Sequence, residues 1–181
     1  MRLLAPATLA VTALLGVFCG SSPTSGRTLE KTAAPAVTLQ GGARSVDQLV
    51  DQVLHALRKN DVDALRALRV TEREYREIIL PGAAKPGEPP LQYAPEFTEF
   101  LWGSLNTKNY HGERVLFGGW GGKALTLQET WLNREREFAG YKSYGRVDLK
   151  LTDDQGNEVL LEMGSIAKVG DRFKFVSFVR N

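Results

Sequence analysis

The best candidate for proton-transfer chemistry in this sequence is the carboxylate of Glu162. Gly170-Asp171 has the form of a two-residue hairpin loop, and the register that it sets pairs Ile166 with Phe175 and Glu162 with Val179. Because side chains alternate along a strand, Glu162 then shares the more aromatic face of the hairpin with Phe175. If that face lines an interior cavity, Glu162 becomes a candidate proton donor or acceptor. The alternative is an exposed edge position or a structural ion pair with an arginine.

The two histidines form no recognisable catalytic or metal-binding motif. His55 follows Asp51 by one helical turn and falls opposite the apolar stripe of its helix, which is typical of a solvated residue with a weak ion-pair neighbour. His111 lies in a polar stretch that favours a surface position. With a single cysteine and no clustered histidines, we expect neither a metal site nor a cofactor.

The glycine-rich stretch Gly118–Lys123 does not make a phosphate-binding loop. That motif requires a glycine five residues before its last glycine and a serine or threonine after the lysine, and Phe117 and Ala124 occupy these places. The stretch instead predicts a helix stop followed by a bend into the first strand. The nucleophile elbow Gly-x-Ser-x-Gly of many hydrolases is also missing from the sequence.

Cys19, the only cysteine, ends a short apolar segment that begins after Arg2. A positive charge followed by an apolar run too short to span a membrane comfortably is typical of an export signal. The site resembles that of bacterial lipoproteins, in which the cysteine thiol carries a lipid that anchors the protein to a membrane. Phe18 and Gly16 depart from the small and aliphatic residues favoured before that cysteine. Ordinary signal cleavage, which leaves a soluble periplasmic or extracellular protein, therefore stays open.

The composition divides the chain into three parts. We expect a signal segment at residues 1–19, a flexible linker rich in Ser, Thr, Ala, Pro and Gly at 20–44, and one domain at 45–181. The 23 Lys and Arg residues are interspersed with 21 Asp and Glu residues, for a net charge of +2. No basic stripe is present, so a nucleic-acid partner is not expected.

Within the domain, predicted helices precede predicted strands. A capping box at Ser45–Gln48 starts an amphipathic helix that ends near Asn60, and a second capping box at Thr71–Glu74 starts another that should stop before Pro81. Pro95 suits the first turn of a long third helix. From Leu125 onward the apolar period changes to two, which predicts antiparallel strands. Helices followed by an antiparallel sheet define an α+β fold.

This order of elements resembles the nuclear transport factor 2-like superfamily, and more narrowly its uncharacterised exported bacterial members. The stretches that carry the resemblance are Leu68–Tyr75, Gly118-Gly119, Gly164–Ile166 and Gly170–Phe175. The resemblance implies a curved antiparallel sheet wrapped around helices to form a cone. Some enzymes of the superfamily work with Asp or His inside the cone, but their catalytic patterns have no counterpart in this sequence. The fold hosts binding modules as readily as enzymes.

Two functions follow as hypotheses. The first is a non-catalytic cell-envelope protein that binds a small apolar ligand or a protein partner through the cone; the alternative is a small lyase, isomerase or hydrolase that uses a cavity carboxylate. A homodimer is also possible, because both faces of the last hairpin carry apolar residues. Aromatic residues that could line the cavity, or simply fill the core, are Tyr75, Phe97, Trp102, Trp131, Phe173 and Phe175.

Overall fold

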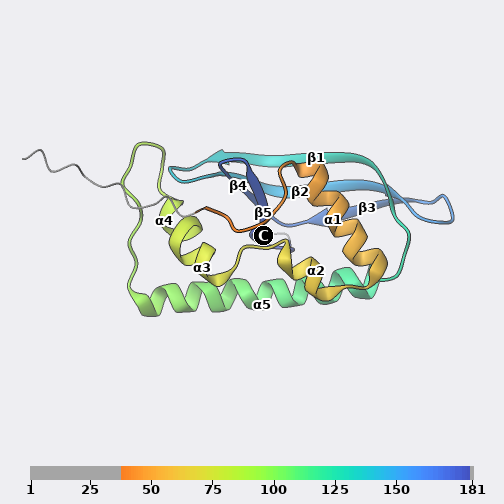
Figure 1. The fold of residues 1–181 in the computed structure, drawn as a ribbon, viewed down its shortest axis with the longest axis horizontal. Helices are drawn as coiled ribbons and strands as arrows, with labels where there is room; N and C mark the ends of the chain where they lie inside the picture. The colour runs from red at the N-terminus through yellow and green to blue at the C-terminus, as the bar shows by residue number, and fades with distance from the viewer. Residues whose placement is uncertain (1–37, 180–181) are drawn as a thin grey trace, which may run out of the picture. The chain divides into compact units, whose positions relative to one another are not determined.

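The computed structural model describes residues 38–179, and Cys19 with the rest of the predicted signal segment lies outside the described residues. The helices span Val46–Lys59 (α1), Val62–Ala67 (α2), Glu72–Glu74 (α3), Leu80–Gly82 (α4) and Pro95–Trp120 (α5), and Tyr75–Ile79 forms a π-helical turn (η1). The strands span Thr126–Glu137 (β1), Lys142–Thr152 (β2), Glu158–Met163 (β3), Ile166–Val169 (β4) and Arg172–Phe175 (β5). Helices precede one antiparallel sheet, as the α+β prediction requires (Figure 1).

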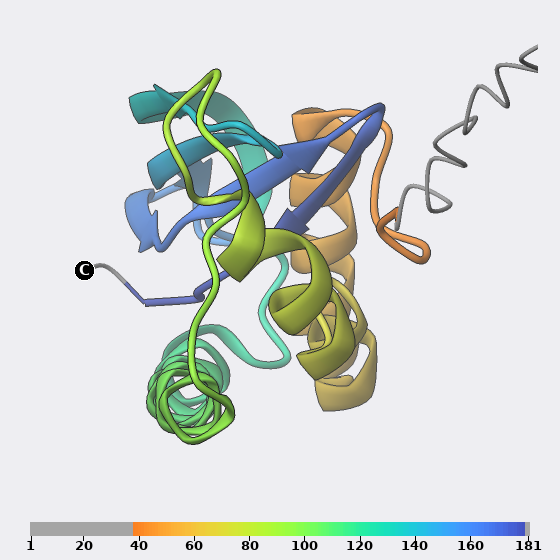
Figure 2. The same cartoon turned by 90° about the vertical axis from the view of Figure 1, so that its left-hand side faces the viewer.

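The main core lies between α1 and one face of the sheet. Figure 2 shows α1 on one side of the strands, and α5 seen end-on below them. The apolar stripe of α1, Leu49, Val50, Val53, Leu54 and Leu57, packs in one cluster with residues of β2 and β3 that include Val147, Leu149, Leu151, Leu161 and Met163. Each such fully buried side chain contributes about 1.5–3 kcal/mol relative to exposure, so this cluster is the main source of stability.

The folded unit begins before Ser45. Leu39 is buried against a second, smaller apolar cluster, and Ala43 is fully buried. Ala43 also exchanges two backbone hydrogen bonds with Phe173 of β5, at 3.0 and 2.8 Å. The last residues of the predicted linker therefore form part of the domain.

The helical segment that begins after Thr71 runs through Pro81 rather than stopping before it. The predicted capping box is present: the Thr71 hydroxyl accepts from the Glu74 N–H, and the Glu74 carboxylate accepts from the Thr71 N–H. The next five residues widen into the π-helical turn η1, in which the Leu80 N–H donates to the carbonyl of Tyr75. A proline ring normally clashes with the carbonyl four residues earlier, and the wider turn directly before Pro81 makes room for it.

The sheet has the order β1-β2-β4-β5, and β3 pairs with β2 alongside β4. β3 ends at Met163 and β4 begins at Ile166, with an interruption between them. There the Gly164 N–H donates to the carbonyl of Phe178, so the backbone pairs with the C-terminal segment and not with β2. The interruption separates β3 from β4, and both strands pair with β2.

This interruption overturns the position predicted for Glu162. The predicted register of the β4–β5 hairpin is confirmed, but its alternation does not continue into β3. Met163 and Ile166 are three residues apart and would face opposite ways in a regular strand, yet both are fully buried in the main core. Glu162 therefore turns outward, is exposed, and pairs across the sheet with Asp148 and not with Val179.

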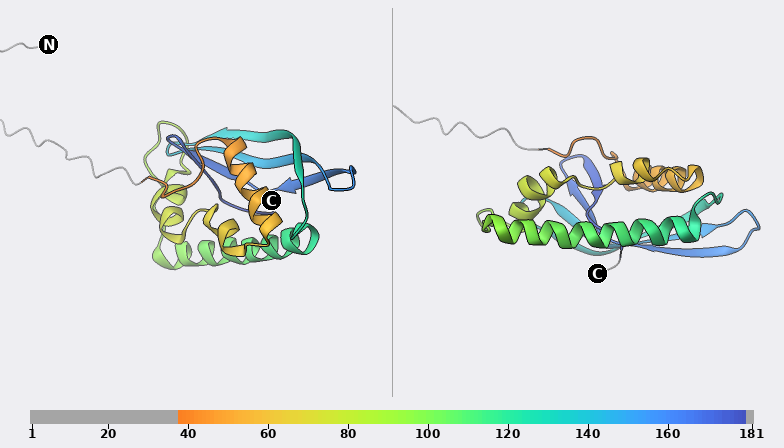
Figure 3. Two further views of the ribbon diagram at one scale, coloured as in Figure 1. Left: turned by 45° about the vertical axis from the view of Figure 1, so that its right-hand side comes forward. Right: turned by 90° about the horizontal axis from the view of Figure 1, so that it is seen from below.

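The side chain of Asn109 connects the long helix α5 to the segment that follows β5. The buried amide of Asn109 donates to the carbonyl of Val176 (3.1 Å) and accepts from the N–H of Phe178 (2.8 Å), as a neighbouring strand would. Gly112, one turn later, lets the two elements approach: a Cβ there would lie 2.9 Å from Val179 Cγ1. Figure 3 shows α5 running along the strands in the view from below.

Candidate functional site

A groove of about 250 Å³ opens on the sheet where the β1–β2 hairpin ends. It is formed by the last residues of β1, the first residues of β2, the link between β3 and β4, and the segment after β5. Its lining residues are Arg134, Arg136, Phe138, Tyr141, Ser143, Gly145, Ser165 and Val176.

Small residues on β2 make the groove concave. Ser143 of β2 lies directly opposite Arg136 of β1, and Gly145 of β2 lies next to Arg134. A Cβ on Gly145 would lie 3.2 Å from the Cβ of Arg134, so a larger residue there would crowd the arginine stem. The sheet therefore has a floor of small side chains, with two long cationic side chains along its edge strand.

The two arginines have no carboxylate partner in the part of the chain that the structure describes. Neither side chain makes a hydrogen bond or ion pair with another described residue, and the groove lining contains no Asp or Glu. By contrast, Glu135 between them pairs with Lys142, whose ammonium lies 2.7 Å from the carboxylate. Arg134 also has a φ of 58°, in the left-handed region that non-glycine residues rarely adopt. Backbone strain of this kind concentrates at ligand sites.

An aromatic pair forms the wall at the hairpin tip. The rings of Phe138 and Tyr141 lie 4.9 Å apart, and the Phe138 N–H donates to the carbonyl of Tyr141. Burial, together with the nearby Tyr75, raises the pKa of Tyr141 to about 12. Tyr141 is therefore neutral near pH 7, and its hydroxyl can donate a hydrogen bond but cannot act as a general base there.

Backbone contacts hold this tip against α4. The Gly140 N–H donates to the carbonyl of Gly82 (3.1 Å), and the Ala139 N–H donates to that of Ala84 (2.9 Å). The two glycines approach so closely that a Cβ on Gly140 would lie 2.7 Å from the Gly82 Cα. The aromatic wall is therefore anchored to the helical part of the domain.

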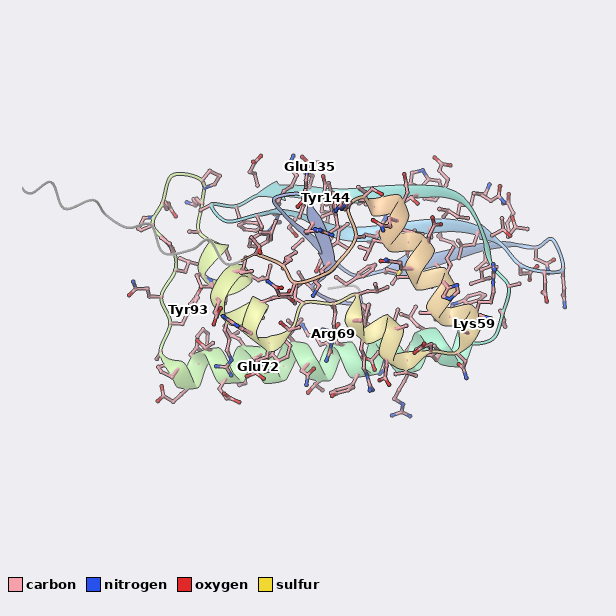
Figure 4. The ribbon with its side chains drawn as sticks, in the orientation of Figure 1. Lys59, Arg69, Glu72, Tyr93, Glu135 and Tyr144 are labelled. Atoms are coloured by element: carbon pink, nitrogen blue, oxygen red, sulfur yellow. The ribbon has the colours of Figure 1, made fainter. Side chains whose placement is uncertain are left out.

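The aromatic residues predicted to line a cavity lie in three separate places. Tyr75 and Trp102 are in contact, with ring centroids 5.6 Å apart, and Phe97 joins them through Tyr93 near the start of α5 (Figure 4 labels Tyr93). Trp131 lies on the exposed face of β1, and Phe173 and Phe175 are buried in the main core. None of the six lines the groove, although Tyr75 lies near its wall residue Tyr141.

The predicted carboxylate does not reach the groove either. Glu162 lies on the outer face, opposite Asp148, which is itself 5% exposed. One oxygen of Asp148 accepts from Arg146 (2.7 Å) and from Asn133 (2.9 Å), while its other oxygen is buried without a hydrogen-bond partner among the described residues. The carboxylate most removed from water on this face is thus Asp148, held as an ion pair.

The histidines lie elsewhere. His111 is exposed on α5, and His55 borders two shallow grooves beside α1, of about 400 and 560 Å³. Asp51 lines both of these grooves, but no hydrogen bond joins it to His55 in the described structure. Across residues 38–179 there is no group of three or more side chains that could hold a metal ion. Over the same residues, no helix is both long and apolar enough to cross a membrane.

Sequence reasoning missed Arg134 and Arg136. In the sequence they belong to Asn133–Glu137, whose alternating charges are typical of a solvated strand. What distinguishes them is the row of small residues opposite, which only the strand register reveals.

Comparison of the chain with protein-family models, with curated proteins and with solved structures finds no match.

Proposed function

We propose that this domain is a non-catalytic binding module that holds a small ligand in the groove at the β1–β2 hairpin. One observation carries the proposal. The ionisable side chains of the groove are two arginines, which remain protonated in proteins, and Tyr141, whose pKa is raised to about 12. General acid–base catalysis needs a group that titrates near the operating pH, and this groove offers none among its lining residues.

The apolar part of the ligand would lie against the aromatic wall. Phe138 and Val176 are only partly buried, so they have surface left to cover. The anchoring of the tip to α4 supports a wall formed before the ligand arrives, which lowers the entropic cost of binding.

The alternative enzymatic function has no comparable support. It requires a carboxylate inside the cavity, and Glu162 is exposed and does not line the groove. The groove itself contains no Asp, Glu, His or Cys among its lining residues.

The proposal includes the cone architecture and the cell envelope. Helices that precede an antiparallel sheet, with a long α5 beside it, support a nuclear transport factor 2-like cone with the groove at one end. Export rests on the charge and apolar run of residues 1–19, and a lipid anchor rests on Cys19.

An NMR titration of the full chain with the neutral aromatic probe 2-naphthamide tests the binding function. We expect the backbone amides of Phe138 and Tyr141 to shift progressively, and Phe138→Ala to weaken binding several-fold because half of the aromatic wall is removed. Phe100→Ala is the matched control, since Phe100 is 67% exposed and lies outside the groove. Equal binding by the two variants, or shifts confined to α5, would exclude the groove as the ligand site.

A further inference from the structure

We propose that the groove selects an organic anion: a small molecule in which a carboxylate, or another compact anionic group, is attached to an aromatic or apolar body. This inference rests on the proposed function and names the ligand class of the same site.

The charge of the groove is the first argument. Arg134 and Arg136 lie two residues apart on β1, and both side chains line the same groove. Five other arginines of the described domain form ion pairs with acidic residues, as Arg146 does with Asp148 at 2.7 Å; they are Arg66, Arg73, Arg76, Arg146 and Arg172. The two groove arginines have no such partner within residues 38–179, so an anion between them would meet charge that the described domain leaves uncompensated.

The hydrogen-bonding groups are the second argument. A guanidinium presents planar pairs of N–H donors that match the two oxygens of a carboxylate, and such charge-assisted bonds are roughly twice as strong as neutral ones. Two hydroxyl donors lie nearby: Ser143 of β2 lies opposite Arg136, and Ser165, between β3 and β4, lines the same groove. The floor between them is Gly145, whose missing side chain leaves space for the anionic group.

The backbone of Arg134 is the third argument. Its φ of 58° takes a β-strand residue into the left-handed region, which is unfavourable for a residue with a side chain. Glycine would adopt this backbone conformation without strain, but residue 134 is an arginine whose side chain lines the groove. A binding role for that side chain accounts for this combination.

The dimensions of the groove limit the ligand. Its volume of about 250 Å³ lies below the roughly 300–1,000 Å³ typical of drug-sized sites. The aromatic wall and the arginines belong to the same small space, so the anionic group and the ring must lie close together. An aromatic acid of one or two rings satisfies both conditions.

The test compares two probes of nearly equal shape, 2-naphthoate and 2-naphthamide, by NMR titration of the full chain. We expect the anion to bind at least tenfold more tightly than the amide, and added salt to weaken the anion alone. Arg136→Gln should lower naphthoate affinity about tenfold and leave naphthamide unchanged. Arg114→Gln on α5, an exposed arginine outside the groove, is the control and should change neither. The backbone N–H resonances of each protein variant show whether the variant is folded.

The outcomes separate the two proposals. If both probes bind equally and shift the groove amides, anion selectivity is wrong and the binding function stands. If neither probe shifts those amides, both proposals fail. If naphthoate keeps its advantage when both Arg134 and Arg136 are replaced by glutamine, the anion is held elsewhere and the inference is overturned. Sedimentation with phosphatidylglycerol vesicles that depends on Arg136, without naphthoate binding, would assign these arginines to a membrane surface and also overturn it.

Discussion

Replacement of Lys174 by methionine should destabilise the domain strongly, because it leaves a buried carboxylate with too few partners. Lys174 and Glu74 are each 3% exposed, and the ammonium lies 3.0 and 2.9 Å from the two carboxylate oxygens. The pair joins β5 to α3 across 100 residues of sequence. Methionine keeps the length and the apolar part of the lysine side chain but removes the charge.

The magnitude follows from what remains around Glu74. Removing one partner of a buried ion pair typically costs about 3–5 kcal/mol. Here the carboxylate keeps two backbone donors, the N–H of Thr71 at 2.7 Å and that of Gln40 at 2.6 Å. These bonds satisfy part of the charge, so we expect the lower end of the range, about 3 kcal/mol at pH 7.

The loss should depend on pH in a defined direction. Burial acts to raise the pKa of Glu74, but hydrogen bonds from Thr71, Lys174 and Gln40 outweigh it and leave the pKa below its ordinary value of 4.5. Since the folded-state pKa is lowered, the stability that ionised Glu74 contributes is present above about pH 4.5 and is lost as the pH falls through the folded-state value. Without Lys174, Glu74 binds a proton more easily, so the variant should approach the wild type in stability in acid.

Urea denaturation at pH 7 and at pH 4, followed by circular dichroism, measures the free energy of unfolding of both proteins. Lys142→Met is the control, because the Lys142–Glu135 pair is solvent-exposed and should contribute about 0–1 kcal/mol. A loss below 1 kcal/mol at pH 7, or an equal loss at both pH values, would refute the claim that an uncompensated buried charge determines the effect.

Three further predictions concern other parts of the chain. Asn109→Leu should lower the free energy of unfolding by about 3 kcal/mol, because it leaves the carbonyl of Val176 and the N–H of Phe178 without hydrogen-bond partners. Each such buried group costs about 1–3 kcal/mol. Urea denaturation measures this loss, and a loss under about 1 kcal/mol would contradict the role of the Asn109 amide. Thr71→Ala should cost about 1 kcal/mol through the lost cap while Thr71→Ser stays nearly neutral, and equal thermal shifts for both would assign the effect to the methyl group. Mass spectrometry of the protein from its native host should find a lipid-modified Cys19 as the first residue, and an unmodified N-terminus beyond it would exclude the anchor but not export.

Local signals in the sequence predicted local structure well. The capping box at Thr71 and the hairpin loop at Gly170-Asp171 each depend on residues a few positions apart, and both are confirmed. The position of Glu162 was wrong because alternation was carried across Gly164, where the backbone pairs with another segment. The interruption arises from the contact of Gly164 with residues 177–179. The apolar periodicity of a single strand carries no information about such a contact.

The candidate site could not be predicted from the sequence for a related reason. Arg134 and Arg136 acquire their setting from Ser143, Gly145 and Ser165, which lie on other strands or between them. Each of these residues is ordinary by itself, and only the pairing of the strands makes a concave surface of them. The same holds for Asn109, a polar residue in a helix whose role depends on a backbone that lies 67 residues further along the chain.

The contact between Gly82 and Gly140 has a consequence for how much sequence change each loop tolerates. Neither glycine has a positive φ, so their backbones alone do not require glycine. A Cβ on Gly140 would lie 2.7 Å from the Gly82 Cα, and a Cβ on Gly82 would lie 3.0 Å from the Gly140 Cα. In a saturation-mutagenesis screen Gly140 should therefore reject even alanine, and Gly82 should accept it only with a small backbone shift. The proline-containing segment 85–90 is exposed and should accept insertions or a spectroscopic label. A label placed there would lie near the groove without disturbing the backbone contacts between Gly82 and Gly140 that hold its aromatic wall.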